Sequence, residues 1–312
     1  MNVVVTGGAG FIGSNLCREL ASRSTVGKVV ALDDLSTGFA ANLAGTDVEL
    51  VEGSILDREL VEDVLADADA VVHLAARPSV PRSLADPFAS HEVNATGTVR
   101  ILEACRRRRT HVVAASSSSV YGSVTALPKH EDLPTRPLSP YAASKLATEA
   151  YVLAYGTAFG LPALAFRFFN VYGPRQSAGH AYAAVVPAFI DAALRGRPLT
   201  VFGDGHQTRD FTYVGTVARV LADAVVRKVT HASPVNLAFG TRVSVLELAH
   251  RLAKTLELAV EIRHEAPRRG DVRDSQADDA ALRGLFMRLE AVPLEEGLAE
   301  TVEWFRSLPA YA

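Results

Sequence analysis

The sequence has few cysteines, which limits the kind of protein it can encode. Cys17 and Cys105 are the only two among 312 residues. Both stand among apolar residues in segments with helical spacing, where a free thiol behaves as a small hydrophobic side chain. The sequence therefore offers no disulfide scaffold, and we expect both thiols to be free and the protein to work in a reducing, cytoplasmic location.

The sequence also lacks a strong excess of charge and any long hydrophobic run. A formal net charge of −3 gives no general attraction to nucleic acid. The strongest basic run, 106–109, ends a helix-like segment at 93–108, where cations meet the negative helix end. No apolar run reaches membrane-spanning length, and the first expected strand begins at residue 3, so we expect no signal peptide. The expected partners are therefore small molecules, with no nucleic acid, no membrane and no metal.

The pattern of apolar segments indicates the fold class. Strand-like runs occur at 48–51, 70–74, 111–115 and 164–169, with helix-like segments between them. This alternation predicts an α/β fold with a Rossmann-type doubly wound parallel sheet. At 312 residues a smaller second lobe is expected beside it. Ligands of such sheets collect at the carboxyl ends of the strands.

The first strand-like run, 3–6, leads into a glycine-rich turn. Gly7, Gly10 and Gly13 follow at G-x-x-G-x-x-G spacing, a close variant of the dinucleotide fingerprint. Such glycines permit an unusual φ, a close approach of backbone to a pyrophosphate, and close packing of the next helix, whose N–H groups bind the phosphates. The spacing predicts dinucleotide binding, with a simple tight turn as the alternative.

A carboxylate follows the second strand-like run, 28–32. Asp33 lies about 20 residues past Gly13, the offset at which an acid meets the adenosine ribose hydroxyls. A carboxylate there repels a 2′-phosphate, and no Arg or Lys occurs in 33–42 to offset that repulsion. The sequence therefore favours NAD over NADP.

Side chains suited to proton chemistry follow the strand-like run at 111–115. Four serines come first, at 116–119, and hydroxyls can orient a sugar. Tyr141 and Lys145 then open a helix and share one face of it. A free Tyr has a pKa of about 10, but a nearby ammonium and a nicotinium charge favour the phenolate. The pair predicts a proton-transfer site, with an exposed tyrosine and lysine as the alternative.

These motifs together resemble the extended short-chain dehydrogenase/reductase family, and within it the nucleotide-sugar 4-epimerases, above all those acting on UDP-sugars. The similarity covers 6–13, 32–38, 73–76, Asn94, 116–122, 141–145 and 167–175. The resemblance implies an NAD-binding Rossmann domain at 1–172 plus 208–239 and a nucleotide-sugar-binding lobe at 173–207 plus 240–312. It also implies a homodimer.

The resemblance assigns roles to individual residues. Ser117 is implied as the catalytic hydroxyl, Tyr141 as the base, and Lys145 as the residue that holds the nicotinamide ribose. The residues implied for NAD are Gly7, Gly10, Phe11, Ile12, Gly13, Asp33, Asp34, Ser36, Thr37, Gly38, Ser54, Ile55, Leu74, Ala75, Ala76, Asn94, Tyr141, Lys145 and Phe168. Those implied for the sugar nucleotide are Ser117, Ser118, Ser119, Tyr141, Asn170, Val186, Thr200, Phe202, Arg209, Arg268 and Asp271.

Two of these positions depart from the family pattern. Ser54 stands where the family more often has an adenine-binding Asp, and Phe168 stands where several epimerases carry Tyr. The arginines have independent support, because their planar forked donors suit phosphate oxygens.

The residues after Ser117 separate the reactions that the family performs. Its 4,6-dehydratases carry an Asp-Glu pair there, and its decarboxylases place Glu just before Val-Tyr-Gly, whereas this chain has Ser118 and Ser119. The reaction that remains for this chain is oxidation and re-reduction at C4 through a 4-keto sugar. The hydroxyl row favours UDP-glucuronate and UDP-galacturonate, because a C6 carboxylate could use extra donors. UDP-glucose with UDP-galactose, UDP-N-acetylhexosamines and a non-catalytic NAD-sensing role stay open as alternatives.

Overall fold

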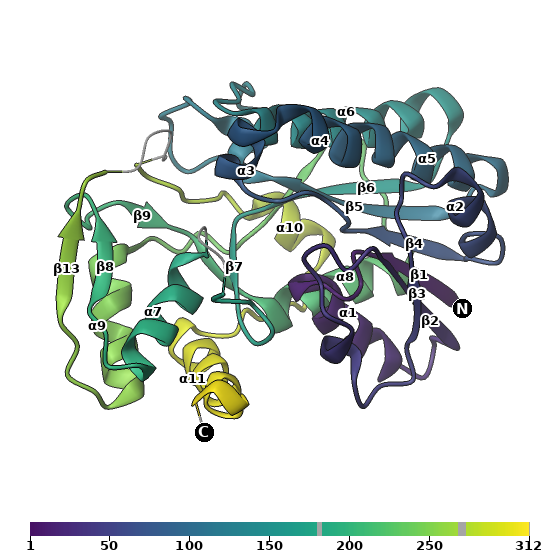
Figure 1. Ribbon diagram of the computed structural model, residues 1–312. Coiled ribbons are helices and arrows are strands. Elements are labelled where there is room, and N and C mark those ends of the chain that lie inside the picture. The colour runs from purple at the N-terminus through teal and green to yellow at the C-terminus, as the bar shows by residue number, and fades with distance from the viewer. Residues whose placement is uncertain (180–182, 268–272, 312) are drawn as a thin grey trace.

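A parallel β-sheet forms the centre of the larger part of the molecule. The computed structural model describes residues 1–179, 183–267 and 273–311 (Figure 1). Within them seven strands are ordered β11-β6-β5-β4-β1-β2-β3, and every neighbouring pair is parallel. The strands are β1 Asn2–Thr6, β2 Lys28–Asp33, β3 Glu49–Glu52, β4 Ala70–His73, β5 His111–Ser117, β6 Ala163–Phe168 and β11 Val235–Leu237.

Helices cover both faces of the sheet. On one face lie α1 Phe11–Ala21, α8 Val214–Val226 and the short α10 Ala280–Leu285; on the other lie α2 Arg58–Val64, α5 Gly97–Arg108 and α6 Pro140–Phe159, with α3 Val80–Ala85 and α4 Pro87–His91 beside α6 (Figure 1). Short helical turns occur at η1 Ala40–Leu43, η2 Glu92–Thr96, η3 Ser118–Tyr121 and η4 Pro309–Tyr311. The predicted doubly wound α/β sheet is confirmed.

The apolar run in β1 shows why the central strands carry so few polar residues. Successive side chains of a strand point to opposite faces. Val3 and Val5 are therefore buried in the core shared with α1 and α8, whereas Val4 is buried in the core shared with α5 and α6. Because both faces are covered, a central parallel strand is apolar at nearly every position.

A second core lies in the smaller lobe. It is built by α7 Val185–Leu194, α9 Val245–Leu256 and α11 Leu294–Arg306 around the parallel pair β8 Leu199–Phe202 and β13 Ile262–Glu265. Two further short pairs run between the sheet and this lobe: β7 Asn170–Tyr172 with β10 Phe211–Tyr213, and β9 Thr208–Arg209 with β12 Val243–Ser244. Leu282 and Phe286 pack in the core of the large sheet although the expected lobe includes 240–312. The lobe boundaries stay a prediction.

Both cysteines are free and buried, as expected, and burial raises the pKa of each thiol to about 12. Among the helices of the described residues, none is both long and apolar enough to cross a membrane.

Candidate active site

The predicted site residues gather at one edge of the sheet. Parallel strands end on the same side, and the last residues of β1, β2, β4 and β5 are Thr6, Asp33, His73 and Ser117. The glycine turn, the ribose acid and the hydroxyl row therefore meet where ligands of doubly wound sheets bind.

The glycine turn after β1 is closely packed. Gly7 has φ +71°, and a Cβ placed on it would lie 2.8 Å from the backbone nitrogen of Ala75. A Cβ on Gly13 would lie 2.0 Å from the carbonyl oxygen of Gly7. The chain therefore accepts only glycine at these two positions without moving backbone.

The start of α1 fits a phosphate. Its N-cap residue is Gly10, which supplies no side-chain hydrogen bond to the first turn. The N–H groups at the start of a helix have no partner within the helix, and they carry a partial positive charge. Phe11, Ile12 and Gly13 contribute these groups, so the predicted dinucleotide residues are suited to a pyrophosphate.

The carboxylate of Asp33 is buried beside this turn. Its Oδ2 accepts a hydrogen bond from the backbone N–H of Ala9, and its Oδ1 accepts one from Leu35, each 2.9 Å long. A Cβ on Gly38 would lie 2.9 Å from Oδ1, so only glycine lets that loop cross the acid. Burial raises the pKa of Asp33, and the backbone hydrogen bonds oppose that rise. By contrast the exposed Asp34 accepts from the backbone N–H of Ser36 and closes a local turn.

The segment after β4 is held against the glycine turn by a buried polar chain. The backbone N–H of Ala75 donates to the hydroxyl of Thr6, 3.2 Å away, which also contacts Nδ1 of His73 at 2.7 Å. Nε2 of His73 lies 3.0 Å from the hydroxyl of Thr98. Burial and the charge of Lys145 lower the pKa of His73 to about 3, so the ring is neutral. The sequence predicts Leu74, Ala75 and Ala76 at this site but gives no sign of the roles of Thr6, His73 and Thr98.

Asn94 lies in the π-helical turn η2, a conformation that is frequent at functional sites. Its Oδ1 accepts from the backbone N–H of Arg77 at 2.7 Å, and its Nδ2 donates to the hydroxyl of Ser144 at 2.9 Å. Its carbonyl accepts from the hydroxyls of Thr98 and Thr148. Asn94 therefore ties the segment after β4 to α6, and its predicted contact with the cofactor stays a prediction.

Four further residues expected to contact the cofactor lie after β3, at the end of β6 and in the loop after β2. The hydroxyl of Ser54 accepts from the backbone N–H of Leu56 at 3.1 Å and forms the turn after β3. Ile55 and Phe168 are both buried in the cores of the sheet. Thr37 is half-buried in the loop that follows Asp33.

The structure brings Ser117, Tyr141 and Lys145 together. Helix α6 begins at Pro140 after the cap residue Ser139, whose hydroxyl accepts from Ala142, so Tyr141 lies in the first turn. Burial raises the pKa of the Tyr141 phenol, and a hydrogen bond with the Ser117 hydroxyl opposes that rise.

Lys145 lies one turn further along α6 and is buried. Its Nζ donates to the carbonyl oxygen of Ala115 at 2.8 Å. Burial lowers its pKa to about 8, so the side chain is mostly an ammonium at neutral pH. A cation held here can stabilise a phenolate on the same helix face.

The hydroxyl row has a definite arrangement. The hydroxyl of Ser117 accepts from both the backbone N–H and the hydroxyl of Ser119, at 3.2 and 2.9 Å. Ser118 is half-buried, and its hydroxyl has no hydrogen-bond partner within the part of the chain that the structure describes.

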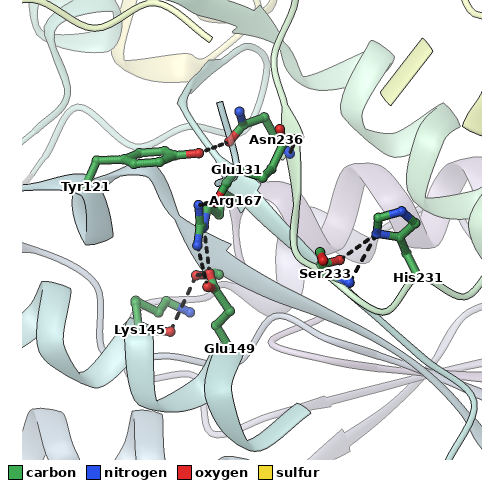
Figure 2. Close-up of polar contacts among 9 residues, drawn as sticks. Tyr121, Glu131, Lys145, Glu149, Arg167, His231, Ser233 and Asn236 are labelled. Carbon is green, nitrogen blue, oxygen red and sulfur yellow. Dashed lines mark hydrogen bonds and ion pairs between the residues drawn. The ribbon is translucent and has the colours of Figure 1, made fainter. Parts of the chain in front are cut away.

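A buried ion pair that the sequence did not predict lies directly behind this group (Figure 2). Arg167 of β6 donates to both carboxylate oxygens of Glu149 on α6, at 2.9 and 2.7 Å. Glu149 also accepts from the hydroxyl of Ser116, 2.7 Å away. The position of Glu149 four residues after Lys145 was the available signal, because that spacing places both on one helix face.

The expected sugar-nucleotide residues lie around the smaller lobe. The backbone N–H of Asn170 donates to the carbonyl oxygen of Asp210, and Nη1 of Arg209 donates to the carbonyl oxygens of Thr208 and Arg273. Thr200 and Phe202 are half-buried and alternate with core residues along β8, whereas the side chain of Val186 is buried in the lobe core. The expected contacts of Arg268 and Asp271 lie outside the described residues. Within those residues, no group of three His, Cys, Asp or Glu side chains could hold a metal ion.

A doubly wound parallel sheet that carries a glycine turn, a buried acid after β2 and a Ser-Tyr-Lys group defines the extended short-chain dehydrogenase/reductases. The chain belongs to the NAD dependent epimerase/dehydratase family, which matches residues 3–238. The predicted family, its NAD cofactor and its enzymatic nature are therefore confirmed.

Individual relatives span nearly the whole chain. It is 40% identical over 318 residues to a UDP-glucose 4-epimerase of Mycolicibacterium smegmatis, covering 98% of this chain and 99% of the relative. It is 34% identical to a dTDP-glucose 4,6-dehydratase of Streptomyces niveus, covering 100% and 94%. Among solved structures it is similar to a UDP-N-acetylglucosamine 4-epimerase from Methanobrevibacter ruminantium M1 in complex with UDP-N-acetylmuramic acid, with a TM-score of 0.93, 36% identity and 98% of each chain covered.

Proposed function

We propose that the protein interconverts the two C4 epimers of a UDP-sugar through a transient 4-keto sugar, with NAD as its cofactor. One observation carries this proposal. Ser117, Tyr141 and Lys145 are assembled at the sheet edge, and hydroxyls rather than carboxylates follow Ser117. Such a site can move a proton at a sugar hydroxyl but lacks, in this segment, an acid and base for elimination.

Each residue of the site has its own role in the proposed reaction. When bound, NAD supplies reversible hydride acceptance at C4 of the sugar. Tyr141 accepts the proton of the 4-hydroxyl, and the Ser117 hydroxyl shares that hydrogen bond. Burial raises the pKa of the Tyr141 phenol and the Ser117 hydrogen bond opposes that rise, while Lys145, an ammonium at neutral pH, supplies a cation that favours the phenolate. Because the 4-keto sugar can turn about its link to the anchored diphosphate, reduction at the opposite face gives the epimer.

A 4,6-dehydratase is the second candidate, because the family includes that activity. Dehydration at C5 and C6 needs a carboxylic acid and a base beside the sugar. The positions directly after Ser117 are Ser118 and Ser119. The buried acid behind the site, Glu149, is fully engaged by Arg167 and Ser116. Epimerisation is therefore favoured.

For the sugar itself we propose UDP-glucuronate and UDP-galacturonate. The Ser119 hydroxyl donates to Ser117, which leaves the Ser118 hydroxyl as the donor of this row without a partner among the described residues. A hydrogen bond to a charged group contributes about 1.5–3 kcal/mol, against about 1 kcal/mol for a neutral one. The relatives named as UDP-glucose and UDP-N-acetylglucosamine 4-epimerases support a neutral sugar instead, and UDP-glucose with UDP-galactose is the alternative substrate pair.

The proposal extends to assembly and location. Large apolar side chains are exposed on α3, α4 and α6, namely Leu84, Phe88 and Tyr151. They support a homodimer in which a second copy of the chain covers this face. Analytical ultracentrifugation, which measures the mass of the protein in solution, tests this directly.

The two free, buried thiols support a reducing, cytoplasmic location.

The experiment is turnover with three sugars side by side. The purified protein is incubated with UDP-glucuronate, UDP-glucose and UDP-N-acetylglucosamine, and the products are identified by mass and by nuclear magnetic resonance. The proposal predicts a C4 epimer of unchanged mass. A product that has lost water or carbon dioxide indicates the dehydratase or decarboxylase reaction, and tightly held NAD without turnover of any sugar indicates an NAD-sensing protein.

A further inference from the structure

The face of α6 that carries the catalytic residues also carries an acid. Tyr141, Lys145 and Glu149 are spaced four residues apart, so they lie on one stripe of the helix. The stripe faces the end of β5: Tyr141 is bonded to Ser117, Lys145 to the carbonyl of Ala115, and Glu149 to Ser116. Figure 2 shows Lys145 and Glu149 leaving α6 toward the same side.

A glutamate four residues from a lysine is a ready ion-pair partner. The side chains of such a pair are neighbours, with Cβ atoms about 5–6 Å apart. In this structure Lys145 instead donates to a backbone carbonyl. Both oxygens of Glu149 are occupied by the guanidinium of Arg167 and by the Ser116 hydroxyl.

The guanidinium is itself held in place from several sides. Arg167 stands opposite Ser116 in the register of β5 and β6. Its Nη1 donates to the carbonyl of Glu131 at 3.2 Å, and its Cζ lies 4.7 Å from the centre of the Tyr121 ring. The hydroxyl of Tyr121 donates to Asn236 at 2.7 Å, which links the group to β11. The side chains of Arg167 and Glu149 are each only 4% exposed, so water does not compete for either charge.

We propose that Arg167 is a positioning residue of the catalytic site: by holding both oxygens of Glu149, it keeps that carboxylate off Lys145. The ammonium then stays on the Ala115 carbonyl, with its remaining donors free for the ribose and for Tyr141. The inference rests on the proposed function, since it explains how the base of that reaction keeps its cation.

The charges around Lys145 are consistent with this role. On its own helix its neighbours one turn away are Tyr141 and Glu149; from the sheet its charge acts on His73 of β4, whereas Arg167 of β6 is bonded to Glu149. His73 is neutral, because burial and Lys145 lower its pKa to about 3. Burial alone accounts for the lowered pKa of Lys145, about 8, with no contribution from the nearby acid. An unpaired Glu149 would raise the pKa of both Lys145 and Tyr141.

The test compares four proteins: wild type, Arg167→Met, the double variant Arg167→Met/Glu149→Gln, and Tyr121→Phe. The pKa of Lys145 is measured on the NAD-bound protein by acetic anhydride labelling over a range of pH, with the Lys145 peptide quantified by mass spectrometry. This measurement needs no UDP-sugar, so it stays readable if the proposed epimerisation fails. The pH profile of kcat is recorded beside it.

Arg167→Met is expected to raise the pKa of Lys145 above its wild-type value and to move the acidic limb of kcat to higher pH. A movement of one pH unit means about a tenfold loss of kcat below the limb. The double variant removes the carboxylate charge as well, and both properties are expected to return toward wild type. A purely structural pair predicts instead that the double variant is as impaired as the single one.

Tyr121→Phe is the matched control, because it removes the hydroxyl that bonds Asn236 and Arg167 while both partners of the ion pair remain. It is expected to lower Tm without moving either pH dependence. Should Arg167→Met not fold, Arg167→Lys replaces it, because a single ammonium cannot hold both oxygens in the forked geometry, and the same shift is expected at smaller size. An unchanged Lys145 pKa in the Arg167 variant that folds overturns the proposal.

Discussion

The carboxylate of Asp33 accepts a 2.9 Å hydrogen bond from the backbone N–H of Ala9, which joins the end of β2 to the glycine turn after β1. The acid is only 7% exposed, and a second N–H, from Leu35, binds its other oxygen. Its position is therefore fixed by the backbone before any cofactor arrives. A negative group held at this point accepts from ribose hydroxyls and repels a 2′-phosphate.

The first prediction concerns cofactor choice. Denaturing the purified protein should release NAD and little NADP. Asp33→Ala should weaken NAD binding by about tenfold or more, because it removes a charged hydrogen-bond acceptor. The matched control is Asp34→Ala, since Asp34 is exposed and bonds only within its own turn. Recovery of mainly NADP, or unchanged NAD affinity in Asp33→Ala, contradicts the assignment.

The second prediction concerns the glycine turn. Gly13→Ala should lower the free energy of unfolding by about 1–3 kcal/mol and strip the protein of NAD, because the new Cβ would lie 2.0 Å from a backbone oxygen. Gly284→Ala is the control: it lies in α10, and an added Cβ would meet nothing within 4 Å. That variant should gain up to about 1 kcal/mol from helix propensity. Urea unfolding measures both, and equal effects would refute the packing explanation.

The third prediction concerns the base. Tyr141→Phe should lower kcat by about 100-fold or more while leaving UDP-sugar affinity largely unchanged, because the ring still packs but the proton acceptor is gone. Lys145→Ala should weaken both binding and turnover. Steady-state kinetics and calorimetric titration separate the two effects. A Tyr141→Phe enzyme with nearly wild-type kcat would move the role of base to the neighbouring hydroxyls.

The fourth prediction concerns substrate choice. Ser118→Ala should lower kcat/KM for UDP-glucuronate by about tenfold and leave UDP-glucose nearly unaffected, because the lost donor serves only a charged C6 group. Ser119→Ala is the matched comparison. Its hydroxyl donates to Ser117, so it should affect all sugars alike. A wild-type preference for UDP-glucose, or an unchanged uronate preference in Ser118→Ala, means that the hydroxyl row does not read the carboxylate.

Much of the fold could be predicted from local patterns. The expected strand at 111–115 is found at His111–Ser117, and the one at 164–169 is found at Ala163–Phe168. Apolar runs in central parallel strands are continuous, so they stand out from the amphipathic helices between them. The glycine turn and Asp33 could be found from the sequence because the number of residues between the glycines and the acid is itself the signal.

Other features depend on contacts that no local pattern contains. A continuous helix was expected from 93 to 108, yet 92–96 forms a π-helical turn. That turn lets the Asn94 carbonyl accept hydrogen bonds from hydroxyls on two helices. The spacing of apolar residues carries no sign of the turn. The pairing of Glu149 with Arg167 likewise requires β5 and β6 to be neighbours. The register of those strands places Arg167 opposite Ser116, whose hydroxyl bonds Glu149, and the spacing along the chain carries no sign of this arrangement.

The most direct test of the account follows one hydrogen atom. A UDP-sugar carrying deuterium at C4 is incubated with the enzyme, and the product is examined by nuclear magnetic resonance. C4 epimerisation removes and returns the same hydride, so the expected product is an epimer of unchanged mass that keeps its deuterium at C4. Deuterium found at C6 of a product that has lost water, or replaced by hydrogen from solvent, would contradict it.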